Sequence, residues 1–211
     1  MAVARETELY LPVKNFFAKR GYEVKSEIRG CDLMAVHPDE PVPTIVELKK
    51  TFTLPLLLQG IDRQKTGAVV WLAVERSRAR RGAHNQRYFE LAELCRRLGL
   101  GMLTVTFYKT REPAVDVWCH PADWQTPRYN AEAAAEESAA GSGIAEPSRA
   151  YDARLGRRAA RMLKEFAARS GDYNIGGSPR QKLVTAYRER ALLCALALYC
   201  HGPSSPKQVR E

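Results

Sequence analysis

The sequence predicts an α/β fold in which helices flank a mixed central sheet, and two observations support this. Over residues 9–108, apolar patterns typical of helices and strands follow one another in the order helix, three strands, helix, strand, helix, strand. One strand-like run, residues 68–74 (AVVWLAV), is apolar throughout, as expected for a strand buried on both faces. Apolar residues make up 45% of the 211 residues, which is sufficient to build a buried core.

The first predicted elements are a helix and three short strands. Apolar side chains recur at helical spacing between Leu9 and Phe17, and Gly21 ends the pattern. Because Pro12 falls inside this pattern, the helix either starts at the proline or is kinked there. Strand-like patterns follow at residues 22–28, 31–36 and 44–49. The short connections between them predict an antiparallel meander.

The next predicted elements alternate between helix and strand. Thr53 is a suitable N-cap for the second helix, and Pro55 is tolerated in its first turn. After this helix come a strand, a basic amphipathic helix and a last strand, at residues 68–74, 84–98 and 101–108.

The C-terminal third differs in composition from the rest of the chain. Residues 129–150 are rich in Ala, Glu, Ser and Gly and lack a periodic apolar pattern, so we expect a flexible linker. Two helices are expected beyond it, over residues 152–170 and 179–200. The chain therefore divides into an α/β domain (residues 1–128), the linker, and a small basic helical region (residues 151–211).

Positive charge is concentrated near the C-terminus. The 33 Lys and Arg residues exceed the 24 Asp and Glu residues, so the formal net charge is +9, and residues 151–211 alone contribute +7. A basic balance favours polyanionic partners, nucleic acid first. Many soluble proteins are equally basic, however, so charge alone leaves both interpretations open.

Cysteine usage and apolar runs bear on the cellular compartment. The five cysteines lack the close spacing of a zinc knuckle and their number is odd, so we expect reduced, mostly buried thiols in a cytoplasmic protein. No charged-then-apolar segment typical of a secretion signal is visible at the N-terminus. The longest apolar run, Ala191 to Cys200, is too short to span a bilayer. We expect it to form a buried helix, and we expect no membrane association.

Three residues on two neighbouring strands form the candidate site. Glu47 and Lys49 are two residues apart, so they point to the same side of their strand, and Asp32 lies near the start of the preceding strand. If the two strands pair as a hairpin, the two acids and the lysine converge. Two carboxylates, with the backbone carbonyl of Leu48, can hold Mg²⁺ or Mn²⁺, and a neighbouring lysine can orient or deprotonate water or stabilise a negative transition state.

A structural interpretation competes with this chemical one. Glu47-Leu48-Lys49 is also what the exposed face of an ordinary half-buried strand looks like. The chemical interpretation is favoured by Asp32, which begins an otherwise apolar strand directly after a turn, where a buried carboxylate is costly without a partner.

These residues resemble the motif of the PD-(D/E)XK nuclease superfamily. Asp32 matches the first acid, and Glu47-Leu48-Lys49 matches the Asp/Glu-x-Lys element on the next strand, whereas Cys31 stands where the motif has proline. The order helix, three strands, helix, strand over residues 6–74 also matches the superfamily core. The resemblance implies a restriction-endonuclease-like fold and a metal-dependent phosphodiesterase in which Asp32, Glu47 and Lys49 are catalytic.

The chain more narrowly resembles a family of bacterial phosphodiesterases of this superfamily. The resemblance rests on residues 6–10, 30–36, 46–49, 58–63, 176–178 and 185–188. Many superfamily members carry an additional metal-binding acid on the first helix, and the candidates here are Glu6 and Glu8. Helical projection puts Glu6 on the inward side, although either acid can simply stabilise a helix N-terminus.

Further candidates lie on and after the second helix. Gln59 and Arg63 are four residues apart and share a helix face. Related nucleases place a glutamine on this helix, so Gln59 would hold phosphate or the attacking water, and Arg63 would contact nucleic-acid backbone. The basic stretch after the apolar strand would also grip phosphates, through Arg76, Arg78, Arg80 and Arg81. Solvated surface positions remain the alternative for all of them.

The sequence therefore predicts a metal-dependent phosphodiesterase that hydrolyses DNA or RNA, with DNA favoured. The alternative is a catalytically inactive nucleic-acid-binding or interaction protein on the same fold. A third hypothesis is a component of DNA repair or defence that acts only within a complex. The sequence leaves open whether the chain acts alone, as a homodimer or in a larger assembly.

Overall fold

The computed structural model describes residues 5–76, 87–121, 147–177 and 182–203, with side chains described from residue 157 in the third segment. The strands are β1 (Glu23–Ile28), β2 (Cys31–Val36), β3 (Thr44–Lys49), β4 (Val69–Glu75), β5 (Gly101–Thr106) and β6 (Ala114–Cys119). The helices are a 3₁₀ turn η1 (Glu6–Leu9), α1 (Tyr10–Ala18), α2 (Leu54–Gln64), α3 (Tyr88–Arg97), α5 (Pro147–Ala168) and α6 (Ala186–His201).

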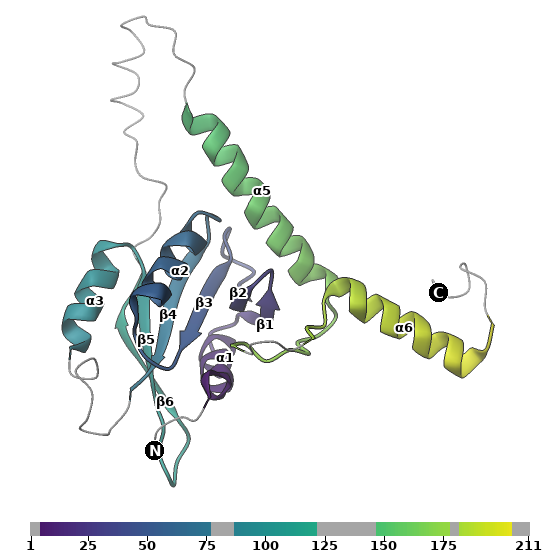
Figure 1. Ribbon diagram of the computed structural model, residues 1–211, viewed down its shortest axis with the longest axis horizontal. Helices are drawn as coiled ribbons and strands as arrows, with labels where there is room; N and C mark the ends of the chain where they lie inside the picture. Colours follow the sequence, from purple (N-terminus) through teal and green to yellow (C-terminus); the bar gives the residue numbers. More distant parts are fainter. Residues whose placement is uncertain (1–4, 77–86, 122–146, 178–181, 204–211) are drawn as a thin grey trace, which may run out of the picture.

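The described strands form one six-stranded mixed sheet in the order β1-β2-β3-β4-β5-β6 (Figure 1). β1, β2 and β3 pair antiparallel, as the short connections predict. β3, β4 and β5 run parallel, and the crossovers between them contain α2 and α3. The α/β class and the restriction-endonuclease-like core with a mixed sheet are therefore confirmed. β6, which pairs antiparallel with β5, is a strand that the sequence patterns did not predict.

Helices cover both faces of the sheet (Figure 1). α1 packs on one face, where Val13 and Phe17 meet buried side chains of β2 to β5. α2 and α3 cover the other face over β4 and β5. The C-terminal part of α5 covers that face beside β1 to β3, where Met162 and Phe166 pack on Ile28 and neighbouring apolar residues.

Local capping explains where the first two helices begin. α1 starts at Tyr10, so Pro12 lies in its first turn, where the backbone N–H that proline lacks has no helical partner anyway. The helix therefore starts just ahead of the proline and needs no kink. At α2, Thr53 is the N-cap as expected, and its side chain accepts a hydrogen bond from Leu56 N at 3.4 Å.

The C-terminal helices depart from the sequence-based expectations. α5 begins at Pro147, inside the expected linker 129–150, of which residues 129–146 lie outside the described residues. α6 begins at Ala186 rather than at residue 179, because Thr185 is its N-cap and accepts from Arg188 N at 3.3 Å.

The expectation that residues 191–200 form a buried helix is wrong. Leu192 is 62% exposed and Tyr199 is 89% exposed. Apolar residues lie all around α6, so a single neighbouring layer cannot cover them, and the helix extends away from the sheet (Figure 1). Its two cysteines are also exposed, whereas the other three are buried as expected, and all five are free thiols. Within the described segments, no helix combines the length and the apolar character needed to cross a membrane.

Candidate active site

Two acids meet where β2 and β3 stop pairing. The paired residues of this hairpin end at Leu33 and Val46, and the next residues along the two strands are Asp32 and Glu47. Instead of continuing the ladder, Asp32 turns its side chain to β3, where its Oδ2 accepts a hydrogen bond from Leu48 N at 2.8 Å. The carboxylate thus takes the place of a strand partner and is held beside Glu47. The two acids therefore lie next to each other, as the hairpin was predicted to place them.

Glu47 is almost fully buried and forms an ion pair with Arg63. Its side chain is 2% exposed, and Arg63 Nε of α2 donates to its Oε1. A second guanidinium nitrogen, Nη2, donates to the backbone carbonyl of Gly30 in the β1–β2 turn. The expected contact of Arg63 with nucleic-acid backbone stays a prediction, and within the chain its guanidinium joins the second acid to the turn that precedes the first.

Burial dominates the ionisation of the two acids. It raises the pKa of Asp32, although the hydrogen bond from Leu48 N and the charge of Lys49 lower it in part. Burial, followed by the negative charge of Asp32, raises the pKa of Glu47 to about 7, and Arg63 only partly opposes this. Both carboxyl groups therefore keep their protons to a higher pH than exposed acids do, and such raised pKa values are typical of functional sites.

Lys49 lies at the carboxyl end of β3 and is held by an acid from the N-terminus. Its Nζ donates to Glu6 Oε2 at 2.9 Å, and each side chain is about one-third exposed. Burial lowers the pKa of Lys49, but the hydrogen bond and charge of Glu6, with the charges of Asp32 and Glu47, outweigh it and raise the pKa. The structure thus brings Glu6 to the cluster, in line with the helical projection.

Glu8 lies in a different environment from Glu6. Its Oε1 accepts a hydrogen bond from Arg5 N at 2.9 Å, which caps the 3₁₀ turn. Its side chain lines a separate hollow together with Leu11 and Phe107. The capping role considered for an acid at this position therefore fits Glu8.

A glycine turn from the C-terminal region closes the site, and the motif did not point to it. A Cβ on Gly176 would come within 2.3 Å of the Asp32 carbonyl oxygen, and one on Gly177 would lie 3.5 Å from Glu6 Cβ. Gly177 also has a φ of +74°, which favours glycine. The adjacent glycines are the sequence signal that could have indicated such a close approach.

The remaining predicted residues lie on α2, after β4, or outside the residues that the structure describes. Gln59 is exposed on α2, one turn before Arg63. Arg76 follows β4, where its Nη1 is 3.6 Å from Asp116 Oδ2 and its guanidinium lies over the Trp118 ring. Arg78, Arg80 and Arg81 lie outside the described residues.

The donor set at the site suits a hard cation. Asp32 and Glu47 are side by side, and the backbone carbonyl of Leu48 lies between Glu47 and Lys49 in the chain. Within the described residues, no group of three or more His, Cys, Asp or Glu side chains is placed to hold a metal ion. Mg²⁺ characteristically uses one or two protein carboxylates and completes its shell with water and phosphate, so this pair fits it.

The C-terminal part of the chain is similar to a known protein family. Residues 133–211 match the model of the family described as "Putative PD-(D/E)XK phosphodiesterase (DUF2161)". The resemblance inferred from the motif is thereby confirmed, from a part of the chain that does not contain the motif. No curated protein and no solved structure matches the chain. Gly176, which lies inside the matched region, packs against Asp32, the first acid of the site.

Proposed function

We propose that this protein is a metal-dependent phosphodiesterase that hydrolyses nucleic acid, DNA in preference to RNA. The observation that carries the proposal is the pairing of the Asp32 and Glu47 carboxylates where β2 and β3 part, with Lys49 two residues further along β3. The family described as PD-(D/E)XK phosphodiesterases, matched by residues 133–211, supports the same reaction class.

Each residue has a role in this proposal. Asp32, Glu47 and the Leu48 carbonyl would hold Mg²⁺ or Mn²⁺, which when bound supplies an activated water and neutralises charge on the phosphate. Lys49 places a positive charge beside the scissile phosphate, and Glu6 orients the Lys49 ammonium through the 2.9 Å hydrogen bond. Gln59, exposed on the neighbouring helix, would hold a phosphate oxygen or the attacking water.

A catalytically inactive nucleic-acid-binding protein is the second candidate. It is favoured by Arg63, whose guanidinium forms an ion pair with Glu47 and so gives the buried acid a counter-ion without a metal. In that case the acids and Lys49 would maintain the fold around the hairpin, and the protein would bind nucleic acid without cutting it.

The experiment that separates the two candidates is a cleavage assay with purified protein. Duplex DNA, single-stranded DNA and RNA are incubated with Mg²⁺, with Mn²⁺, or with EDTA. We expect metal-dependent cleavage, and a loss of at least about 100-fold in Asp32→Asn, Glu47→Gln and Lys49→Met. Asp39→Asn, at an 87% exposed carboxylate beyond β2, is the matched control and should retain full activity. Binding without cleavage under every condition would establish the inactive protein instead.

A further inference from the structure

A basic cleft lies between α5 and α6, beside the turn that precedes Asp32. It encloses about 420 Å³ and is lined by Arg29 from the β1–β2 turn, Arg161 and Lys164 from α5, and Arg190 from α6. Among the described residues that line it, none is aromatic and the one acid is Glu165. The cleft is separate from the acid pair, but Arg29 is only three residues before Asp32.

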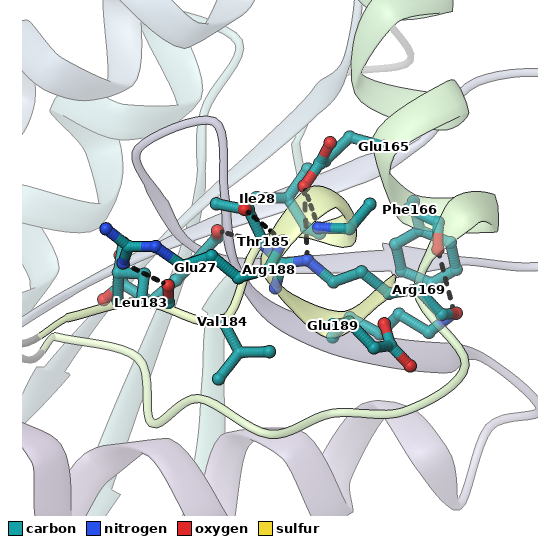
Figure 2. Close-up of polar contacts among 12 residues, drawn as sticks. Glu27, Ile28, Glu165, Phe166, Arg169, Leu183, Val184, Thr185, Arg188 and Glu189 are labelled. Atoms are coloured by element: carbon teal, nitrogen blue, oxygen red, sulfur yellow. Dashed lines mark hydrogen bonds and ion pairs between the residues drawn. The ribbon is translucent and has the colours of Figure 1, made fainter. Parts of the chain in front are cut away.

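Contacts between the two helices fix the shape of the cleft. Arg161, Lys164 and Glu165 lie at helical spacings of three and four, so they face the same side of α5. Glu165 Oε1 accepts from Ala186 N at 3.0 Å and from Arg169 Nε at 3.4 Å, which fixes the start of α6 against α5 (Figure 2). Its charge is therefore used to hold the helices together.

The four basic side chains outnumber the single carboxylate among the described residues that line the cleft. Arg29, Arg161, Lys164 and Arg190 are all exposed, and within the described residues none of them forms an ion pair. The nearest acid on α6, Glu189, accepts hydrogen bonds from Ser170 N and Oγ (Figure 2 shows its position beside Arg169). Among the described residues, the acids that α5 and α6 contribute to this junction thus take part in structural contacts, and Glu165 offsets only part of the positive charge of the cleft.

We propose that this cleft binds backbone phosphates of the nucleic-acid strand that is cleaved at Asp32 and Glu47. The proposal rests on the proposed function and adds to it a binding subsite and its mode of recognition. Four separated cations on three elements suit a run of phosphates better than a single anion. Because the described lining offers no aromatic side chain for base stacking, the cleft would bind the strand independently of sequence.

The spacing between cleft and acid pair agrees with this assignment. Three residues of extended chain span at most about 11 Å, which limits the separation of the Arg29 and Asp32 backbones. Along one strand of a duplex, phosphates rise by about 3.4 Å, so about three nucleotides cover that distance. The cleft would thus hold the strand a few nucleotides from the scissile phosphate.

The test is binding of fluorescent oligonucleotides, measured by anisotropy in EDTA so that no cleavage occurs. Single-stranded and duplex DNA and RNA are titrated with full-length protein at several salt concentrations. Arg161→Ala with Arg190→Ala should weaken binding by about tenfold or more and reduce the salt-dependence slope by roughly 1 to 2. The matched control removes two exposed cations elsewhere, Lys19→Ala with Lys109→Ala, and should change neither quantity.

A double variant that conserves the two charges tests whether misfolding, rather than loss of charge, causes the weak binding. Arg161→Lys with Arg190→Lys should bind within about twofold of the wild type, because phosphate contacts mainly need positive charge. Equal affinity and slope in the alanine pair and the wild type would overturn the proposal. So would binding of polyglutamate, but not of oligonucleotides, through the same residues. If these binding effects are observed but the protein shows no metal-dependent cleavage, the result counts against the nuclease activity and not against the binding site.

Discussion

Gly176 lies directly against Asp32, although 144 positions separate them in the chain. A Cβ at Gly176 would approach the Asp32 carbonyl oxygen to 2.3 Å and Tyr10 Cδ2 to 2.9 Å. These contacts are shorter than real Cβ contacts, and one of them is to backbone, so the neighbours cannot simply rotate away. The C-terminal turn therefore fixes the backbone that carries the first acid of the site.

Gly176→Ala should disable the site through this contact. The backbone at Gly176 has no positive φ, so alanine is conformationally allowed and the substitution isolates the clash with Asp32. Because displacements of about 1 Å can cost about 100-fold in rate, we expect cleavage to fall at least tenfold. Gly67→Ala is the control: its φ is +80° and nothing lies within 4 Å, so it should destabilise by about 1 kcal/mol yet cut normally. Cleavage rates and unfolding midpoints are measured for both variants. Equal cleavage by Gly176→Ala and Gly67→Ala would show that the close contact between Gly176 and Asp32 is not needed for activity.

Arg63 should be needed chiefly to stabilise buried Glu47. Removing one partner of a buried ion pair leaves an uncompensated charge, so Arg63→Ala should lower the free energy of unfolding by about 3 kcal/mol. Adding Glu47→Gln removes that charge, and the double variant should regain about half of the loss. Urea denaturation in EDTA measures both. If the double variant is no more stable than Arg63→Ala, the guanidinium acts elsewhere, for example on nucleic acid.

Local patterns identified the acids and Lys49 because strand alternation and a short hairpin connection are local properties. Alternation places Glu47 and Lys49 on one side, and the β2–β3 hairpin then brings Asp32 to Glu47. The contact of Arg63 with Glu47 was not predicted, because helix spacing shows which residues share a face but not which strand that face covers. Residues 176–178 were part of the family resemblance, but the contact of Gly176 with Asp32 was not predicted, because it depends on how the entire C-terminal region folds back.

Errors of element prediction also have physical causes. β6 is an edge strand of mostly exposed and half-buried residues, and its sequence, residues 114–119 (AVDVWC), has a single charged residue and so lacks the regular apolar–polar alternation of a half-buried strand. The burial of residues 191–200 was inferred from their composition, but burial needs a covering layer, and α6 extends away from the sheet. The start of α6 was placed too early, whereas the N-cap at Thr185 sets it.

Arg169 should be the residue that attaches α5 to the sheet. Its side chain is 1% exposed, and its guanidinium donates to Ser26 O at 2.9 Å and to Glu27 O at 2.8 Å. Arg169→Ala leaves these carbonyls without their charged donor, so unfolding free energy should fall by about 3 kcal/mol. Lysine lacks the planar fork, so Arg169→Lys should lie in between. Arg158→Ala, at an exposed position of α5, should change stability by less than about 0.5 kcal/mol in the same urea titration. If Arg169→Ala lowers the unfolding free energy as little as Arg158→Ala does, apolar packing alone holds α5 on the sheet.

Asp172 should make stability depend on acid pH, because it links the C-terminal turn to α1 and β1. Its Oδ1 accepts from Ser26 N at 2.9 Å and from Ser26 Oγ at 2.8 Å, and its Oδ2 accepts from Tyr10 and Lys14. Burial alone would raise the pKa of Asp172, but hydrogen bonds from Lys14, Tyr10 and Ser26 outweigh burial and hold the pKa below its ordinary value of 3.8.

The sign of this effect follows from linkage. Since the folded pKa lies below the unfolded one, the unfolded chain binds the proton more tightly, and the stabilisation is complete above pH 3.8 and lost as pH falls through the folded pKa. Asp172→Asn should therefore cost about 2 kcal/mol at pH 7 and show a shallower loss of stability between pH 5 and pH 3. Urea titrations across this range, with Asp39→Asn at an 87% exposed site as the control, measure both quantities. If the wild type and Asp172→Asn lose stability in parallel below pH 5, the carboxylate does not tie the turn to the sheet in its ionised form, and the placement of Gly176 against Asp32 must rest on packing instead.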